Sequence, residues 1–193
     1  MNVPALSDIR RIFRSDEGKD TSKRITIEGF QRAGVLVPIL HEAGGVRLLL
    51  TKRTEQVETH KGQISFPGGM VDAADKNIVD TALREVYEEV GIPRSSIETL
   101  GTLDDHPTPT GFIITPVIGI IENPPSLLPN MEEVAEILFV PLDIFLNGKN
   151  ARTELREWRG KHHEVWFYEF GEHLIWGATA GIVRALLKKL QLL

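Results

Sequence analysis

Residues 66–92, FPGGMVDAADKNIVDTALREVYEEVGI, constrain the fold more than any other part of this chain. They predict a Pro-Gly-Gly turn at residues 67–69, where the missing Cβ atoms allow backbone to approach a ligand closely. A short helix follows. Asn77 is a typical N-cap, while Gly91 and then Pro93 are typical of a left-handed C-cap that ends a helix.

The predicted helix has two different faces when its residues are placed at about 100° per residue. One face is an apolar stripe of the kind that packs on a core. The residues of this stripe are Val79, Ala82, Leu83, Val86 and Val90. The neighbouring flank carries Glu85, Glu88 and Glu89. Taken alone, these glutamates favour a solvated acidic face, since carboxylates one turn apart repel by about a few tenths of a kcal/mol.

A divalent cation would reverse that repulsion. Hard cations such as Mg²⁺ take oxygen ligands and sit between one or two carboxylates and a substrate phosphate. Arg84 lies beside the acidic flank, one turn before Glu88, so it can hold a carboxylate without neutralising the whole flank. With the glycine turn in front, this arrangement predicts a site where a short acidic helix meets a polyanion.

Residues 84–92, REVYEEVGI, match the second half of the Nudix box at every fixed position, and Gly69 supplies its opening glycine. The chain therefore resembles the Nudix hydrolase family. The first half of the box departs from the pattern in two ways. Asp75 stands where the pattern has glutamate, and the spacer between Asp75 and Arg84 is one residue longer. Both departures resemble one branch, the coenzyme A pyrophosphatases.

Residues 49–53 and 60–69 resemble the signature that precedes the box in that branch, and later segments extend the resemblance over about residues 30–190. Two positions depart from the signature. Thr54 replaces a small serine or alanine, and Glu58 stands where the signature has arginine. Coenzyme A carries a 3′-phosphate that a basic residue could read, so the change at Glu58 concerns the substrate and not the chemistry.

The resemblance implies the Nudix fold, an α/β/α sandwich with a mixed β-sheet between helices. Apolar runs predict strands at 32–41, 46–53, 97–103, 111–121, 137–140 and 164–170, and helices at 5–14 and 176–190. We expect residues 1–24 to form an N-terminal helix and polar segment. Residues 25–193 are expected to form a single Nudix hydrolase domain, with its box at 69–92.

Composition limits the classes of function. A hydrophobic fraction of 41% and a charged fraction of 25% are typical of a globular protein. No apolar run reaches the roughly 20 residues of a membrane span, and a net charge of -5 argues against nucleic-acid binding. The absence of cysteine excludes thiol catalysis and fits a reducing compartment, so we expect a cytoplasmic protein. The expected partner is a small nucleotide, with no nucleic acid and no membrane, and a homodimer is left open.

The resemblance implies metal-dependent hydrolysis of a pyrophosphate linkage, with Mg²⁺ or Mn²⁺ as cofactor. It implies Glu85 and Glu89 as primary metal ligands, while Glu88 shares a second ion or its water shell. The carbonyl of Gly69 is expected to contribute a further ligand. Arg84 is expected to orient Glu88 and not to touch the substrate.

The general base is less well defined, since some members of the family take it from the box and others from a distant loop. Glu133 and Glu136 both lie on a segment from which such an acid could reach the site. For each of them, a plain surface charge is an equally good interpretation. We choose Glu133 as the candidate. The substrate-facing candidates, in the strand and loop that enter the box, are Arg53, Lys61, Gln63, Ser65, Phe66 and Gly68.

Other conspicuous side chains receive structural interpretations. His60 and His106 each stand alone in a loop, so surface or hydrogen-bonding roles are expected. Trp158, Trp166 and Trp176 belong to no recognisable nucleic-acid motif and are expected to be core or packing residues instead of stacking platforms.

The leading hypothesis is a hydrolase of coenzyme A or acyl-CoA that releases 3′,5′-ADP and 4′-phosphopantetheine or its acylated form. One alternative is the same chemistry on an ADP-ribose-like compound, a dinucleotide or a nucleoside diphosphate sugar. Another is a ligand-binding Nudix module without turnover. That module is disfavoured because such modules often lose box acids, and this chain retains Glu85, Glu88 and Glu89.

Overall fold

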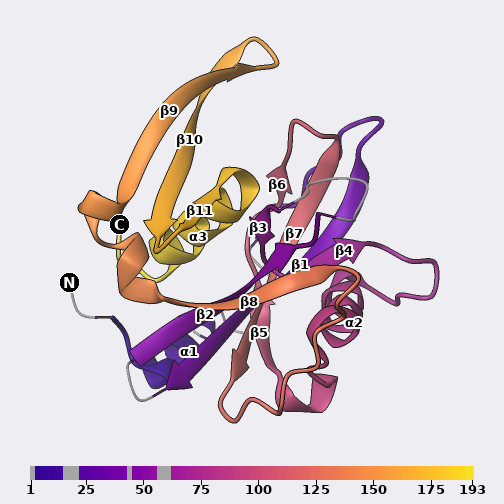
Figure 1. The fold of residues 1–193 in the computed structure, drawn as a ribbon. Helices are drawn as coiled ribbons and strands as arrows, with labels where there is room; N and C mark the ends of the chain where they lie inside the picture. The colour runs from indigo at the N-terminus through magenta and orange to yellow at the C-terminus, as the bar shows by residue number, and fades with distance from the viewer. Residues whose placement is uncertain (1–2, 15–21, 43–44, 56–61) are drawn as a thin grey trace.

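The computed structural model describes residues 3–14, 22–42, 45–55 and 62–193. A mixed sheet forms its centre (Figure 1). The strands along the sheet, in the order β3-β2-β1-β7-β5, are β3 (Ile64–Ser65), β2 (Gly45–Arg53), β1 (Gln31–Glu42), β7 (Phe112–Ile121) and β5 (Glu98–Thr102). At its margins β4 (Gly68–Met70) pairs with β1, β6 (His106–Pro107) with β7 and β8 (Val134–Pro141) with β2. The β1–β7 pair is parallel, whereas β1–β2 and β5–β7 are antiparallel.

Helices cover both faces of this sheet. The alternation of side chains along β1 sends Val37 and Ile39 into one core cluster and Leu36 and Leu40 into another. The first cluster contains residues of α1 (Leu6–Arg14) and α3 (Gly177–Lys189), and the second contains the apolar stripe of α2 (Ile78–Val90). The predicted α/β/α sandwich is therefore confirmed. None of the described helices combines the length and apolar character of a membrane span.

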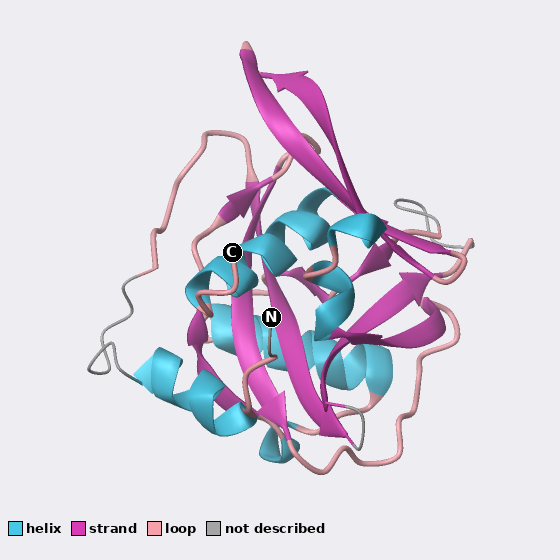
Figure 2. Cartoon of the chain, turned by 90° about the vertical axis from the view of Figure 1, so that its left-hand side faces the viewer, coloured by secondary structure: helices cyan, strands magenta, loops and turns pink. Residues whose placement is uncertain are grey.

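A second, three-stranded sheet stands beside the first. It consists of β9 (Ala151–Trp158), β10 (Lys161–Phe170) and β11 (His173–Trp176), all antiparallel. Its inner face buries Tyr168 and Ile175 in the same core cluster as α3. The hairpin of β9 and β10 extends beyond the helices, as Figures 1 and 2 both show.

Several boundaries differ from the sequence prediction. Only residues 164–170 were predicted as strand in this region, whereas β10 starts at Lys161 and both β9 and β11 were missed. Trp176 closes β11 and does not begin the terminal helix. The sequences of the short strands β3, β4 and β6 do not predict strands by themselves, because each strand is formed by pairing with a longer neighbour. The 3-10 turns are η1 (Arg94–Ser96), η2 (Leu142–Phe145) and η3 (Gly148–Asn150).

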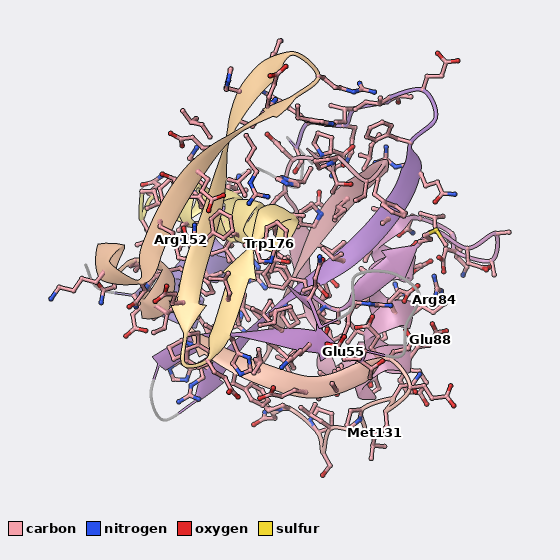
Figure 3. All side chains as sticks on the ribbon, turned by 45° about the horizontal axis from the view of Figure 1, so that its top comes forward. Glu55, Arg84, Glu88, Met131, Arg152 and Trp176 are labelled. Carbon is pink, nitrogen blue, oxygen red and sulfur yellow. The ribbon has the colours of Figure 1, made fainter. Side chains whose placement is uncertain are left out.

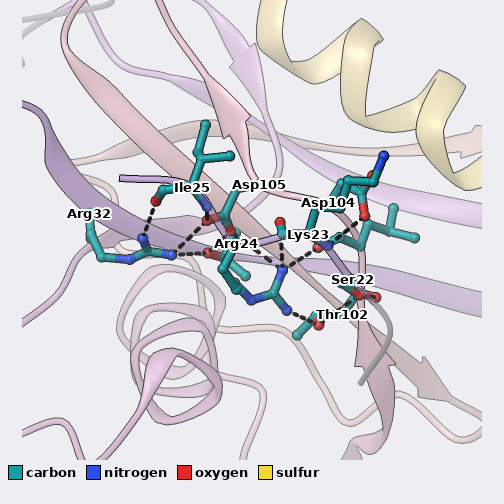
Figure 4. A network of polar contacts seen from close by, with 10 residues as sticks. Ser22, Lys23, Arg24, Ile25, Arg32, Thr102, Asp104 and Asp105 are labelled. Atoms are coloured by element: carbon teal, nitrogen blue, oxygen red, sulfur yellow. Dashed lines mark hydrogen bonds and ion pairs between the residues drawn. The ribbon is translucent and has the colours of Figure 1, made fainter. Parts of the chain in front are cut away.

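The segment before β1 is held by a buried carboxylate (Figure 4). The side chain of Asp105 is fully buried, and it accepts hydrogen bonds from Arg32 Nη2 at 2.9 Å and from the backbone N–H of Ile25 at 2.9 Å. The hydroxyl of Thr115 donates to it at 2.7 Å. The carbonyl of Arg32 in turn accepts from the N–H of Val71 at 3.1 Å, so this network also fixes the strand that ends the glycine turn.

Candidate active site

The box helix has the two caps that its sequence predicts. The side-chain oxygen of Asn77 accepts from the N–H groups of Val79 at 2.9 Å and Asp80 at 3.1 Å. At the other end Gly91 takes the left-handed conformation, with φ 76°, and its N–H donates to the carbonyl of Tyr87 at 3.0 Å. The helix therefore begins and ends where capping chemistry requires.

The glycine turn brings α2 into direct contact with the backbone of the sheet. A Cβ atom on Gly68 would lie 2.5 Å from the carbonyl oxygen of Gly34, and one on Gly34 would lie 2.8 Å from that of Ile78. A Cβ atom on Gly69 would lie 2.4 Å from Glu85 Oε1. The carboxylate of Glu85 thus occupies the space that a larger residue at Gly69 would need.

Arg84 connects the box loop to the acidic flank. Its Nε and Nη2 donate to the two carboxylate oxygens of Asp75, each at 3.0 Å. Its Nη1 donates to Glu85 at 2.8 Å and to Glu88 at 2.9 Å, and Nη2 also donates to the carbonyl of Met70 at 3.0 Å. The hydrogen bonds from Arg84 hold the pKa of Asp75 well below its ordinary value. Arg84 was predicted only to orient Glu88, but it also binds Asp75, Glu85 and the backbone of the box loop.

Glu89 is the most unusual group in the site. It is 4% exposed, and its Oε2 has no hydrogen-bond partner among the described residues. Burial, together with the nearby charge of Glu85, raises its pKa to about 8, although Arg53 and a backbone hydrogen bond to Gly68 act in the opposite direction. Burial also raises the pKa of Glu85, which the hydrogen bond from Arg84 opposes.

The donor set suits a hard divalent cation. Glu85 and Glu89 offer carboxylate oxygens on one flank, and a buried oxygen without a partner calls for a ligand or an ion. In the described part of the chain, no three acidic or histidine side chains are already arranged around a single point. Arg84 instead engages Glu85 and Glu88. Cation binding would therefore require these carboxylates to adjust while Glu89 already presents a bare oxygen.

The segment before β8 adds a further acid to this cluster. The N–H of Leu128 donates to the carbonyl of Val90 at 3.0 Å, and the N–H of Asn130 donates to the backbone carbonyl of Glu89 at 2.9 Å, so the segment docks on the end of α2. Asn130 Nδ2 then donates to Glu133 Oε1 at 3.2 Å. The negative charge of Glu133 raises the pKa of both Glu85 and Glu89, although it is not the largest cause in either case.

Glu136, the other acid considered from sequence, lies elsewhere. It is opposite Lys52 in the β2–β8 pair, and its carboxylate lies 3.5 Å from His173 Nε2 of β11. The structure thus brings Glu133 to the carboxylate cluster and leaves Glu136 at the edge of the second sheet.

Arg53 lies at the end of β2, at the irregularity in its pairing with β8. Its Nε is buried and has no hydrogen-bond partner among the described residues, and its charge lowers the pKa of Glu89. A guanidinium beside the carboxylates with an unused donor is suited to a phosphate oxygen.

The other substrate-facing candidates divide into three groups. Ser65 and Gly68 lie half-buried at the turn, as does Gln63, whose carbonyl accepts from the N–H of Arg53 at 2.9 Å. Phe66 is 3% exposed and packs in the hydrophobic core, so its side chain offers no surface to a substrate. Lys61 lies outside the described residues, as do Glu58 and His60.

His106 is not a loop residue as expected but lies in β6. Its ring fills the space beside Gly181 of α3, where a Cβ atom would come within 2.5 Å of the ring, and burial lowers its pKa. It is a packing residue between β6 and α3.

Two residues near the site were missed by sequence reasoning. The hydroxyl of Thr54 donates to the carbonyl of Glu132 at 2.8 Å, and its N–H donates to that of Glu133 at 2.9 Å. Together with Asn130 it fixes the acid-bearing segment. The signal for Asn130 was the Pro-Asn pair at residues 129–130, which favours a turn at that point.

Comparison with known proteins agrees with this architecture. The NUDIX domain model matches residues 30–167. A protein of Photorhabdus laumondii named Uncharacterized Nudix hydrolase NudL is 40% identical over 161 residues, which cover 83% of this chain and 86% of the relative. A protein of the same name from Escherichia coli O1:K1 / APEC is 40% identical over 159 residues, covering 81% of each chain.

Solved structures share the fold at low identity. A Nudix hydrolase from M. smegmatis, RenU, gives a TM-score of 0.50 at 23% identity and covers 61% of this chain and 74% of its own. A MutT/nudix family protein from Enterococcus faecalis gives a TM-score of 0.50 at 14% identity, and the match covers 98% of this chain and 81% of that protein.

Proposed function

Because this chain belongs to the Nudix hydrolases, enzymes that hydrolyse pyrophosphate bonds, we propose that it hydrolyses the pyrophosphate of coenzyme A or acyl-CoA. The products would be 3′,5′-ADP and 4′-phosphopantetheine or its acylated form. The observation that carries the chemistry is the buried Oε2 of Glu89, which has no hydrogen-bond partner in the described part of the chain and lies within reach of the charge of Glu85. The choice of coenzyme A rests on the signature-like residues 49–53 and 60–69 of the sequence.

Nudix hydrolases generally use divalent metal ions such as Mg²⁺ or Mn²⁺. In this chain the groups proposed to hold them are Glu85, Glu89, Glu88 and the carbonyl of Gly69. Such ions, when bound, screen phosphate charge, activate water and stabilise the leaving phosphate. Arg84 would keep Glu85 and Glu88 in place, since it already donates to both, and would not itself contact the substrate.

Glu133 is the proposed general base. The amide of Asn130 holds its carboxylate, and its charge raises the pKa of both Glu85 and Glu89, which supports a position near the proposed metal site. Its role would be to accept the proton of the attacking water. Arg53 would meet a phosphate oxygen through the Nε that has no partner among the described residues.

A second candidate function is the same hydrolysis of another nucleoside diphosphate compound, such as an ADP-ribose-like compound, a dinucleotide or a nucleoside diphosphate sugar. The observation in its favour is Glu58, which replaces the arginine of the coenzyme A signature. A ligand-binding module without turnover is disfavoured by the retained acids Glu85, Glu88 and Glu89. The absence of cysteine supports a reducing setting such as the cytoplasm.

A substrate panel tests the proposal. The purified protein is incubated with Mg²⁺ or Mn²⁺ and with coenzyme A, 3′-dephospho-coenzyme A, ADP-ribose, a dinucleotide or a nucleoside diphosphate sugar. We expect metal-dependent release of 3′,5′-ADP from coenzyme A. Preference for another compound would support the second candidate, and no hydrolysis of any compound with either metal would contradict both.

Glu58→Arg provides a matched test of substrate choice. If the 3′-phosphate is read near this position, the substitution should improve the use of coenzyme A relative to its 3′-dephospho form. An unchanged ratio would show that the 3′-phosphate is not read at residue 58.

A further inference from the structure

The outer face of the second sheet carries a row of side chains that crosses all of its strands. Phe167 of β10 is the direct register partner of Arg152 in β9 and of Trp176 in β11. The rings of Phe167 and Trp176 are stacked, with centroids 5.7 Å apart and planes inclined by 6°. The guanidinium of Arg152 lies 4.0 Å from the Phe167 centroid, and that of Arg156 lies within 5.5 Å of both rings. We call Arg152, Arg156, Phe167 and Trp176 the outer row.

One ring of this outer row is covered and the other is open. Phe167 is 4% exposed, whereas Trp176 is 37% exposed. The sequence predicted a core or packing role for Trp176, and its ring does pack against Phe167, but the residue keeps more than a third of its surface exposed. An exposed indole supported from behind by a parallel ring is a rigid, flat surface on which another ring can stack.

The outer row is also positively charged. Arg152 and Arg156 both pair with a single acid, Glu154, so one positive charge remains in a chain whose net charge is -5. Lys161 and Glu169, near the two ends of β10 on the same face, add one positive and one negative charge. The row therefore combines an open aromatic ring with guanidinium groups, which favours a ligand that is both flat and anionic.

The outer row lies next to the strand that leads into the box. β11 packs beside β3, and the hydroxyl of Thr179, in the first turn of α3, donates to the carbonyl of Ile64 at 3.0 Å. In Figure 3 Trp176 lies between Arg152 on one side and Arg84 with Glu88 on the other. The outer row therefore lies on the β3 side of a ligand bound at Glu85 and Glu89, where β3 leads into the glycine turn.

We propose that the outer row is the subsite for the nucleotide end of the substrate, with the purine base stacked on Trp176 and a phosphate paired with Arg152 or Arg156. This rests on the proposed function, since the pyrophosphate itself would lie at Glu85 and Glu89. Every base has a π face, so stacking on an open aromatic ring suits it. Arginine binds phosphate through a planar fork. Arg152 or Arg156 would thus supply the positive charge that the signature arginine provides in the coenzyme A branch and that Glu58 lacks.

Steady-state kinetics with coenzyme A test the stacking surface. Trp176→Leu keeps an apolar cover on Phe167 but removes the flat ring, and it should raise KM about tenfold while kcat stays within about twofold. Trp176→Phe should restore most of the affinity. Leu174→Ala is the matched control, because Leu174 is 39% exposed in the same strand and points to the same face. An unchanged KM in a folded Trp176→Leu protein would overturn the proposal.

A binding measurement separates this proposal from the catalytic one. Titration of the metal-free protein with 3′,5′-ADP should quench tryptophan fluorescence, and Trp176→Leu should abolish that quenching even if coenzyme A is not hydrolysed. No quenching in the unmodified protein would overturn the subsite whatever its catalytic activity. If Trp176→Leu does not fold, the double variant Arg152→Gln/Arg156→Gln decides: it should weaken 3′,5′-ADP binding and leave adenosine binding unchanged, and equal binding of 3′,5′-ADP by this variant and the unmodified protein would refute the subsite.

Discussion

Arg84 holds Asp75 through two parallel hydrogen bonds, from Nε and Nη2 to the two carboxylate oxygens, each 3.0 Å long. The same guanidinium donates to Glu85 and Glu88. A single arginine thus joins the loop with its extra residue to the acidic flank of the box helix. Among the residues that the structure describes, no group donates a hydrogen bond to Oε2 of the buried Glu89.

Asp75→Asn should destabilise the protein, because it replaces a paired carboxylate whose side chain is 5% exposed with a neutral amide that cannot accept both bonds. We expect the free energy of unfolding in urea to fall by about 2 kcal/mol. Asp72→Asn, in the same loop but on an exposed residue, is the control and should cost much less. Equal losses in the two variants would show that the bidentate pair contributes little.

The metal-free protein should lose stability as pH rises through neutrality. The raised pKa of Glu89, about 8, means that the folded state retains a proton that the unfolded state releases near pH 4.5. Stability therefore falls between these values, by about 1.4 kcal/mol per pH unit at most. Urea unfolding from pH 5 to 8 measures this slope, and Glu89→Gln should flatten it. A slope that is the same in both proteins would rule out this titration.

Asp75 should act in the opposite direction at low pH. Its pKa is lowered by Arg84, so its contribution to stability is present above about pH 4 and is lost as pH falls through the folded-state pKa. Acid unfolding of Asp75→Asn should therefore show a weaker dependence on pH below 4 than the unmodified protein. A parallel dependence would assign the acid sensitivity to other carboxylates.

Glu85→Gln and Glu89→Gln should each lower kcat by about two orders of magnitude or more while the fold is kept, since each removes a charged oxygen from the proposed metal site. Stabilisation by Mg²⁺ in a thermal melt should be lost in parallel. Glu132→Gln is the control, because Glu132 is exposed and its contacts near the site are made by its backbone and not by its carboxylate. Normal turnover in both site variants would contradict the proposal that Glu85 and Glu89 hold the metal ion.

Local chemistry explains which parts of the fold could be predicted. Asn77 and Gly91 mark the box helix because capping depends on nearby residues, and the central strands have apolar runs. β9 was missed because its sequence, ARTELREW, has no such run. Its arginines are accommodated by pairing with Glu154 and by lying over Phe167, and neither relationship is visible until the strands are in register.

The same limit applies to the candidate site. The Arg84–Glu88 pair follows from helical spacing and was predicted, whereas the Arg84–Asp75 pair depends on the path of the loop. Glu133 and Glu136 could not be ranked from sequence because the distinction arises from Asn130, which docks on the helix end and holds Glu133. These contacts place Glu133, and not Glu136, near the box carboxylates, which residue types alone could not show.

Glu133→Gln should lower kcat about 100-fold with little change in KM, the usual worth of a general base, because the amide keeps the hydrogen bond from Asn130 but cannot take a proton. Glu136→Gln is the matched control, since this acid follows in β8 and its carboxylate lies 3.5 Å from His173 Nε2 instead of near the box carboxylates. The pH profile of kcat should lose its acidic limb in the first variant and keep it in the second. If the profile keeps this limb in both variants, one of the box glutamates is the general base instead. If only Glu136→Gln loses the limb, Glu136 and not Glu133 is the base.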